Sequence, residues 1–175
     1  MILIVIGVSG AGKTTVGKLL ARKLGWHFLE ADDFHPEANV EKMRSGHPLK
    51  DKDRWPWLEP LREQIERSVA AGENGVLAYS ALKRKYRDVL RVNSDVKFIF
   101  LCGDYGRIAD QLHHRHGHFM NLALLHSQFA DLEEPTADEG AITMELGRTP
   151  QKLAEEIKAI AELRVLLEET EKKRV

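Results

Sequence analysis

The sequence is poor in cysteine and has no long apolar segment, and each absence excludes a class of protein. Cys102 is the only cysteine among 175 residues, so an intramolecular disulfide and a zinc site built from cysteines alone are both impossible. A single cysteine is also typical of a reducing compartment. The apolar run at residues 2–6 is too short to cross a bilayer, and no charged leader or cleavage-site pattern accompanies it. We therefore expect a soluble cytoplasmic protein with no membrane partner.

The sequence also has no excess of basic residues. Lysine and arginine total 26 against 27 acidic residues, which gives a formal net charge of -1. A protein that binds duplex DNA needs excess cations to contact phosphates, so we expect no nucleic-acid partner. The balance still allows a local cluster of cations around one phosphorylated ligand. With 43% hydrophobic and 30% charged residues, the composition is that of a globular chain, neither disordered nor collagen-like.

Short apolar runs alternate with longer amphipathic stretches along the chain. The pattern predicts strands at residues 2–6, 27–31, 75–79, 96–102 and 142–146, and helices at 13–24, 56–71, 83–91 and 150–167. Strands that alternate with helices indicate an α/β sandwich around a mostly parallel sheet. Because no repeat or linker divides the sequence, we expect one domain over residues 1–167, followed by a charged tail over 168–175 that is a solvated helix end or frayed.

The clearest motif directly follows the first apolar run. Residues 7–14 read G-V-S-G-A-G-K-T and match the phosphate-binding pattern G-x-x-x-x-G-K-[ST]. In such a loop the backbone N–H groups surround phosphate oxygens, the lysine reaches the β- and γ-phosphates, and the hydroxyl binds Mg²⁺. We predict that Lys13 also serves catalysis and that Thr14 binds the metal. The predicted nucleotide-binding residues are Gly7, Ser9, Gly10, Ala11, Gly12, Lys13, Thr14 and Thr15.

Two further motifs are missing, and their absence narrows the class of nucleotide-binding protein. A regulatory GTPase should carry an N-K-x-D guanine reader and a D-x-x-G switch, and neither occurs in this chain. A kinase that transfers the γ-phosphoryl group of ATP to a small molecule is therefore favoured. A nucleotide sensor without catalytic activity is the alternative from a different class.

Charged residues follow the second and third predicted strands. Residues 30–36 read E-A-D-D-F-H-P, and residues 80–88 read S-A-L-K-R-K-Y-R-D. The carboxyl ends of parallel strands open onto the ligand crevice, where carboxylates can position an acceptor hydroxyl or hold Mg²⁺ through water. Cations there can bind an anionic acceptor. Each stretch can equally be a helix cap, a solvated loop or a basic helix face. Trp55 and Trp57 are interpreted as packing anchors.

These blocks together resemble the gluconokinase family of P-loop kinases, which is related to shikimate and nucleoside monophosphate kinases. The resemblance covers residues 1–163 and rests on residues 7–14, 32–36, 39–49, 53–58, 80–88, 117–119 and 127–135. It implies transfer of the γ-phosphoryl group of ATP to the 6-hydroxyl of D-gluconate. It also implies a five-stranded parallel sheet between helices, a mobile lid at about residues 107–135, and a homodimer. A related kinase for another small hydroxy acid, such as shikimate, is the alternative.

The resemblance also implies roles for individual residues on the acceptor side. Asp32 matches the carboxylate that orients or deprotonates the acceptor hydroxyl. Cations suited to the sugar acid's carboxylate or to the transferred phosphate stand at Arg54, Lys83 and Arg87, and His35 and His118 match positions in substrate-binding blocks. The sequence departs from the family pattern at three positions, namely Glu30 in place of aspartate, Tyr79 in place of a small residue, and Gln111 in place of arginine. Glu30 is a candidate to reach Mg²⁺ through water.

Histidines are concentrated at residues 113–118, which read H-H-R-H-G-H. A zinc site is one interpretation, but no cysteine is nearby and the spacing fits no known zinc pattern. By resemblance the segment belongs to the lid. Arg115 would then bring a guanidinium to the phosphates in the transition state, and closure of the lid would exclude water.

Overall fold

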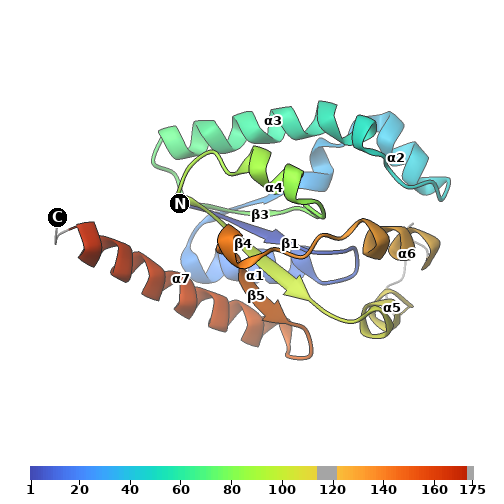
Figure 1. The fold of residues 1–175 in the computed structure, drawn as a ribbon. Helices are drawn as coiled ribbons and strands as arrows, with labels where there is room; N and C mark the ends of the chain where they lie inside the picture. The colour runs from blue at the N-terminus through green and yellow to red at the C-terminus, as the bar shows by residue number, and fades with distance from the viewer. Residues whose placement is uncertain (114–121, 173–175) are drawn as a thin grey trace.

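The computed structural model describes residues 1–113 and 122–172 and contains one sheet of five parallel strands (Figure 1). Their order in the sheet is β2-β3-β1-β4-β5. The strands are β1 (Ile2–Ile6), β2 (His27–Glu30), β3 (Gly75–Ala78), β4 (Val96–Cys102) and β5 (Ile142–Glu145). Ile4 of β1 pairs with Leu77 of β3 on one side and with Phe98 of β4 on the other. The parallel sheet predicted from the alternating pattern is thus confirmed.

The central strand is apolar throughout because it is covered on both faces. All five residues of β1 are buried, as expected for a parallel strand between two helical layers. Leu3 and Val5 point into one apolar cluster, and Ile2, Ile4 and Ile6 point into another on the opposite face. The alternation of side chains along one strand therefore supplies the core on both sides of the sheet.

Helices cover the two faces of the sheet and complete the sandwich (Figure 1). The helices are α1 (Lys13–Leu24), α2 (Glu37–Arg44), α3 (Asp51–Ala70), α4 (Arg84–Leu90), α5 (Tyr105–His113), α6 (Leu122–Asp131) and α7 (Pro150–Lys172). Buried residues of α1 and α7 pack in the cluster around Leu3, whereas those of α3 and α4 pack in the cluster around Ile4. None of the helices described has both the length and the apolar content that a membrane span requires.

Two helices extend beyond their predicted limits. Helix α3 begins at Asp51 rather than at Pro56, because Lys50 caps it by donating its backbone N–H to Asp53 Oδ2 at 2.7 Å. Pro56 and Pro60 lie inside this helix on its exposed side, where water can satisfy the carbonyls that prolines leave unpaired. Helix α7 continues past the predicted end at residue 167, through Lys172.

The two tryptophans of α3 differ in environment. Trp57 is buried and packs in the core, as expected. Trp55 is 42% exposed and meets Tyr86 in a T-shaped contact outside the core, so its interpretation as a packing anchor is wrong. The two residues are separated by about 200° around the helix, which places them on opposite faces.

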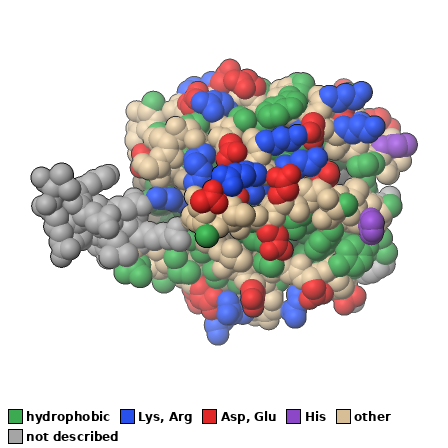
Figure 2. Space-filling view, viewed as in Figure 1, with side chains coloured by type: hydrophobic (Ala, Val, Ile, Leu, Met, Phe, Trp, Pro, Cys, Tyr) green, Lys and Arg blue, Asp and Glu red, His purple; other side chains and the backbone are tan. Residues whose placement is uncertain are grey.

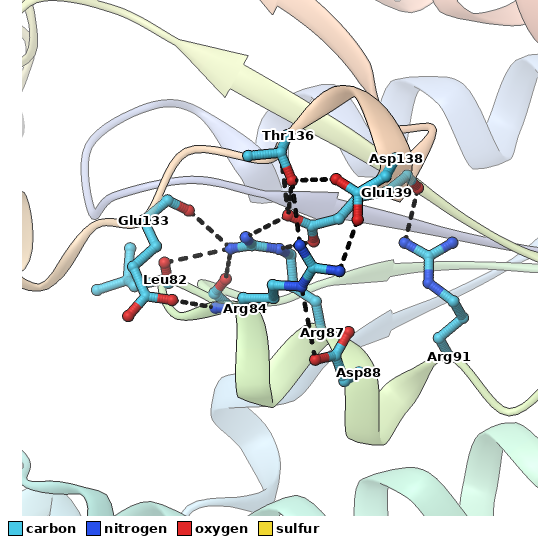
Figure 3. A network of polar contacts seen from close by, with 10 residues as sticks. Leu82, Arg84, Arg87, Asp88, Arg91, Glu133, Thr136, Asp138 and Glu139 are labelled. Atoms are coloured by element: carbon cyan, nitrogen blue, oxygen red, sulfur yellow. Dashed lines mark hydrogen bonds and ion pairs between the residues drawn. The ribbon is translucent and has the colours of Figure 1, made fainter.

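Acidic and basic side chains are interspersed on the face shown in Figure 2. Ion pairs join such side chains, as Arg84 does with Asp138 at 2.6 Å and with Asp88 at 3.8 Å (Figure 3). This mixture agrees with the near-zero net charge of the sequence.

Candidate active site

The loop between β1 and α1 is shaped by three glycines with positive φ. Gly7, Gly10 and Gly12 have φ values of 140°, 86° and 88°. Residues that carry a side chain rarely adopt such angles, whereas glycine adopts them readily. A Cβ atom at Gly10 would also lie 2.7 Å from Leu112 Cγ. Gly12 is the N-cap of α1, so the positive end of the helix dipole opens into the loop. The local sequence thus builds a phosphate-binding turn at the carboxyl end of β1.

Three polar contacts hold this loop in place. Lys13 Nζ donates to the carbonyl of Val8 at 3.0 Å. The backbone N–H of Gly7 donates to the carbonyl of Ser80, which follows β3. The backbone N–H of Ser9 donates to Gln128 Oε1 of α6 at 2.7 Å. The loop is therefore connected to two other parts of the site.

A cavity of about 440 Å³ opens beside the loop. Its lining comes from the loop, from the carboxyl ends of β2 and β3, and from α2, α3 and α6. Seven residues singled out from the sequence lie in this lining: Ser9, Lys13, Thr14, Glu30, Asp32, His35 and Arg54. The structure therefore brings the predicted phosphate side and much of the predicted acceptor side together in one space.

Glu30 and Thr14 provide oxygen atoms at the junction of β2 and α1. Burial raises the pKa of Glu30, a hydrogen bond with Thr14 opposes this shift, and the nearby charge of Asp32 adds to it. Glu30 Oε2 is buried and has no hydrogen-bond partner within the described residues. An anionic oxygen with spare capacity next to a hydroxyl is a donor set that suits Mg²⁺.

No group of three or more histidine, cysteine or acidic side chains in the described ranges can hold a metal ion. Mg²⁺ in this site would therefore take its remaining ligands from nucleotide phosphates and water, as it commonly does. Thr14 and Glu30 fit a Mg²⁺ ion of this kind.

Asp32 and His35 lie together at the turn that follows β2. Asp32 belongs to the 3-10 turn Ala31–Phe34, and its side chain is 72% exposed toward the cavity side of the turn. His35 Nε2 lies 3.6 Å from Asp32 Oδ1. The His35 ring stacks on Trp57 at 3.7 Å, and Trp57 Nε1 donates to the carbonyl of Ala31. Trp57 thus holds this turn in place through its contacts with His35 and Ala31.

Burial lowers the pKa of His35, and the charge of Arg54 acts in the same direction, whereas Asp32 opposes both. The neutral imidazole is therefore favoured. The neutral ring thus lies next to the Asp32 carboxylate, just beyond hydrogen-bond distance, without adding a full charge to the turn.

Arg54 brings a buried cation into the cavity. It lies in the first turns of α3, and its guanidinium is 5.7 Å from the centre of the Tyr86 ring. The hydroxyl of Tyr79 lies beside it, and burial raises the pKa of this hydroxyl. The start of α3 is fixed by Asn39 of α2, whose side chain donates to the carbonyl of Asp53 at 2.8 Å. A guanidinium held in this way can bind a carboxylate through two parallel hydrogen bonds.

Lys83 does not line this cavity. Its Nζ pairs with Asp51 at 3.1 Å and with Asp131 at 3.2 Å, at a second hollow that adjoins the first. The structure thus separates Lys83 from the other predicted substrate-binding residues, and its contact with substrate stays a prediction.

The predicted role of Arg87 in substrate binding is contradicted by its position (Figure 3). Arg87 is 1% exposed, and its Nε and Nη2 donate to the two carboxylate oxygens of Glu139 at 2.6 and 2.9 Å. Its Nη1 donates to the carbonyls of Ala81, Leu82 and Glu133. Every donor group of the guanidinium is thus used by the protein itself. Arg87 links α4 to the segment that follows α6.

Other predicted site residues lie outside the described ranges. These are Arg115 and His118, together with most of the histidine-rich segment and hence its zinc alternative. The lid expected at about residues 107–135 is described in part, as most of α5 and all of α6, and its mobility stays a prediction. Gln111 is described and lies on the exposed side of α5.

Several cavity residues were not assigned a role from the sequence. Gln128, Ser127 and Leu124 of α6 line the cavity, as do Lys18 of α1 and Ser80 after β3. The S-Q-F block at residues 127–129 marks this part of α6, but nothing in its sequence indicates that it meets a loop 119 residues away.

The fold and this cavity together define a P-loop kinase. A family model for the AAA domain matches residues 2–104, which span the phosphate-binding loop and strands β1 to β4. The chain belongs to the gluconokinase family. It is 48% identical to the gluconokinase of Gluconobacter oxydans over 89% of this chain and 88% of that protein.

Solved structures agree with this assignment. A gluconokinase from Sinorhizobium meliloti is 38% identical, with a TM-score of 0.82 over 98% of this chain and 95% of that one. A shikimate kinase from Acinetobacter baumannii, at 17% identity and a TM-score of 0.59 over 96% of this chain and 93% of that one, shares the fold alone.

Proposed function

We propose that this protein transfers the γ-phosphoryl group of ATP to the 6-hydroxyl of D-gluconate, giving 6-phospho-D-gluconate and ADP. The observation that carries the proposal is the shared cavity, where Lys13 and Thr14 of the phosphate loop face the same space as Asp32, His35 and Arg54. The sequence relationship to gluconokinases supports gluconate over shikimate as the acceptor.

On the nucleotide side, the loop N–H groups and the N-terminus of α1 would surround the phosphates. Lys13, whose Nζ lies over the loop at Val8, would donate to the β- and γ-phosphate oxygens. Mg²⁺, when bound by Thr14 and through water by Glu30, would neutralise charge on these phosphates. Arg115 is proposed to add a cation to the transferred group. Catalysis then consists chiefly of positioning and charge stabilisation.

On the acceptor side, Arg54 would bind the carboxylate of gluconate, and Asp32 would accept a hydrogen bond from the 6-hydroxyl. As the oxygen attacks the γ-phosphorus, the bond to the β-phosphate oxygen breaks and the hydroxyl proton leaves through Asp32. His35 Nε2 lies 3.6 Å from the Asp32 carboxylate and would have to move slightly closer to donate a hydrogen bond that orients it. His118 and Lys83 complete the proposed substrate-binding set.

An ADP-release assay with gluconate, shikimate, other sugar acids and nucleoside monophosphates tests the proposal. We expect gluconate alone to stimulate ADP release strongly, with 6-phosphogluconate as the product. Stimulation by another acceptor but not by gluconate would show that the substrate is wrong.

Asp32→Asn distinguishes a kinase from a nucleotide sensor. We expect this variant to bind ATP normally and to lose phosphoryl transfer, because the amide cannot accept the proton. Near-normal turnover would remove Asp32 from the mechanism, and absence of any acceptor-dependent turnover in the unaltered protein would favour a sensor.

A homodimer and a cytoplasmic location complete the proposal, both on family resemblance. Light scattering coupled to size-exclusion chromatography measures the first, and subcellular fractionation measures the second.

A further inference from the structure

Gln128 joins helix α6 to the phosphate-binding loop. The backbone N–H of Ser9 donates to Gln128 Oε1 at 2.7 Å, between residues 119 positions apart. Because an N–H group donates this bond, the oxygen of the carboxamide faces the loop and its nitrogen is turned away. Within residues 1–113 and 122–172, Nε2 makes no hydrogen bond. Two N–H donors of Gln128 are therefore available to a ligand.

The position of Gln128 is set by packed elements. Leu124, Ser127 and Gln128 form one face of α6 and all line the cavity. Leu124 and Leu125 are buried. The chain after α6 is held by Glu133, whose backbone N–H donates to the carbonyl of Leu82 at 2.8 Å. Gln128 thus reaches the loop from a supported helix.

The Gln128 carboxamide lies among the residues that would hold the phosphates and the acceptor. Ser9 belongs to the loop that binds the phosphates, and Lys13 and Asp32 line the same cavity as Gln128. Phosphoryl transfer places negative charge on the oxygens of the transferred group, between the nucleotide and the acceptor. Fixed N–H donors aimed at such oxygens lower the barrier, because they need no reorganisation during the reaction.

We propose that Gln128 is a catalytic residue for phosphoryl transfer, with its oxygen anchored on the Ser9 amide and its N–H groups directed at the transferred phosphoryl group. This inference rests on the proposed kinase function. It assigns to α6 a part in the chemistry in addition to that of Lys13 and Asp32.

Gln128→Met tests the role, because methionine has a similar shape and no strong hydrogen-bonding groups. We expect kcat to fall about 100-fold, as for the loss of one donor to a developing anion. The KM for ATP should stay within about threefold, since the other loop amides and Lys13 still hold the nucleotide. Gln128→Glu should lower kcat at least as far and also raise the KM for ATP, because a carboxylate repels phosphate.

A different result is expected if Gln128 takes no part in phosphoryl transfer. If the carboxamide only occupies the Ser9 amide until phosphate displaces it, Gln128→Met would tighten ATP binding and leave kcat unchanged, which would overturn the proposal. So would a loss of activity matched by a large fall in the melting temperature, which would indicate a structural role. His126→Ala, on the exposed side of the same helix, is the matched control and should keep full activity.

The same assays separate this inference from the proposed function. If the unaltered protein phosphorylates another acceptor, gluconate is wrong and the Gln128 variants are compared with that acceptor. If the unaltered protein is active and Gln128→Met retains its kcat within about threefold, the inference is wrong.

Discussion

At the scale of single residues, Arg54 is the cation best placed to select an acidic acceptor. It is 7% exposed and lies over the Tyr86 ring inside the cavity. A hydrogen bond to a charged group contributes about 1.5–3 kcal/mol, so Arg54→Met should raise the KM for gluconate roughly 10- to 150-fold. The KM for ATP should change little. Steady-state kinetics with each substrate varied measures both values.

Arg67→Met is the control for this prediction. Arg67 lies near the end of the same helix, 64% exposed, where it pairs loosely with Glu63 at 3.7 Å and donates to Gln64 Oε1 at 2.9 Å. The variant Arg67→Met should leave the KM for gluconate and the KM for ATP unchanged. An unaltered KM for gluconate in Arg54→Met would instead place the carboxylate of the acceptor elsewhere.

His35 predicts how stability depends on pH. Burial lowers its pKa below the ordinary value of 6.5, so below that pH the unfolded chain binds a proton that the folded protein does not. Stability should therefore fall with decreasing pH just below 6.5, by up to about 1.4 kcal/mol per pH unit from this group. Urea unfolding at pH 7.5 and 5.5 should show a smaller fall in His35→Gln. An identical fall in both proteins would refute the assignment.

The roles of some of these residues can be predicted from the sequence and those of others cannot, because some depend on neighbours along the chain and others on residues far away in the sequence. Gly7 to Thr14 are contiguous, so spacing alone reveals their function. Arg87 stands in an equally suggestive block, but its role depends on Glu139, 52 residues later, which no local pattern connects to it. Gln128 is the converse case, because the role proposed for it depends on the contact between α6 and the loop, which no local pattern reveals.

At the scale of elements, the link between α4 and the segment after α6 depends on the buried pair Arg87–Glu139 (Figure 3). Removing one partner would leave a buried charge without compensation. Arg87→Met should therefore destabilise the protein by about 3–5 kcal/mol. The double variant Arg87→Met with Glu139→Met should recover part of this loss. Denaturant unfolding of the unaltered protein, of the single variants Arg87→Met and Glu139→Met, and of the double variant measures the coupling free energy between the two residues.

Arg84 provides the control on the same helix. It pairs with Asp138 at 2.6 Å, but both side chains are about half exposed, at 48% and 61%. Exposed pairs of this kind contribute little to stability, so Arg84→Met should cost far less than Arg87→Met. Equal losses for Arg84→Met and Arg87→Met would mean that burial is not the decisive difference.

The elements themselves follow the sequence closely where one periodicity dominates. The bounds of β1, α1 and β4 agree with the pattern at both ends. The start of α3 does not, because Pro56 is typical of a first helical turn and hides the true start at Asp51. Helices α2, α5 and α6 were not predicted. Helix α2 has a single buried residue, Asn39, so it lacks the apolar stripe that marks a helix in sequence.

At the scale of the whole molecule, nucleotide binding should stabilise the fold. The cavity is lined by α1, by α2, α3 and α6, and by the carboxyl ends of β2 and β3, and its ligand would contact several of them at once. A ligand that binds only the folded state at 100 times its Kd adds about 2.7 kcal/mol. ATP with Mg²⁺ should raise the melting temperature of the unaltered protein, and Lys13→Ala should lose most of this increase. An equal increase in both would contradict the assigned phosphate loop.

The position of β1 has a consequence for biosynthesis. Its five buried residues lie at the centre of the sheet, and Ile2 pairs with Gly75 of β3 and with Val96 of β4. A ribosome adds about 5–20 residues per second, so β1 waits roughly 5 to 20 s before β4 has been made. Until β3 and then β4 have been made, an apolar segment with strong β propensity lacks one or both of its neighbours, which favours capture by chaperones or aggregation. Codon choice between β1 and β4 should therefore influence how much folded enzyme a cell obtains.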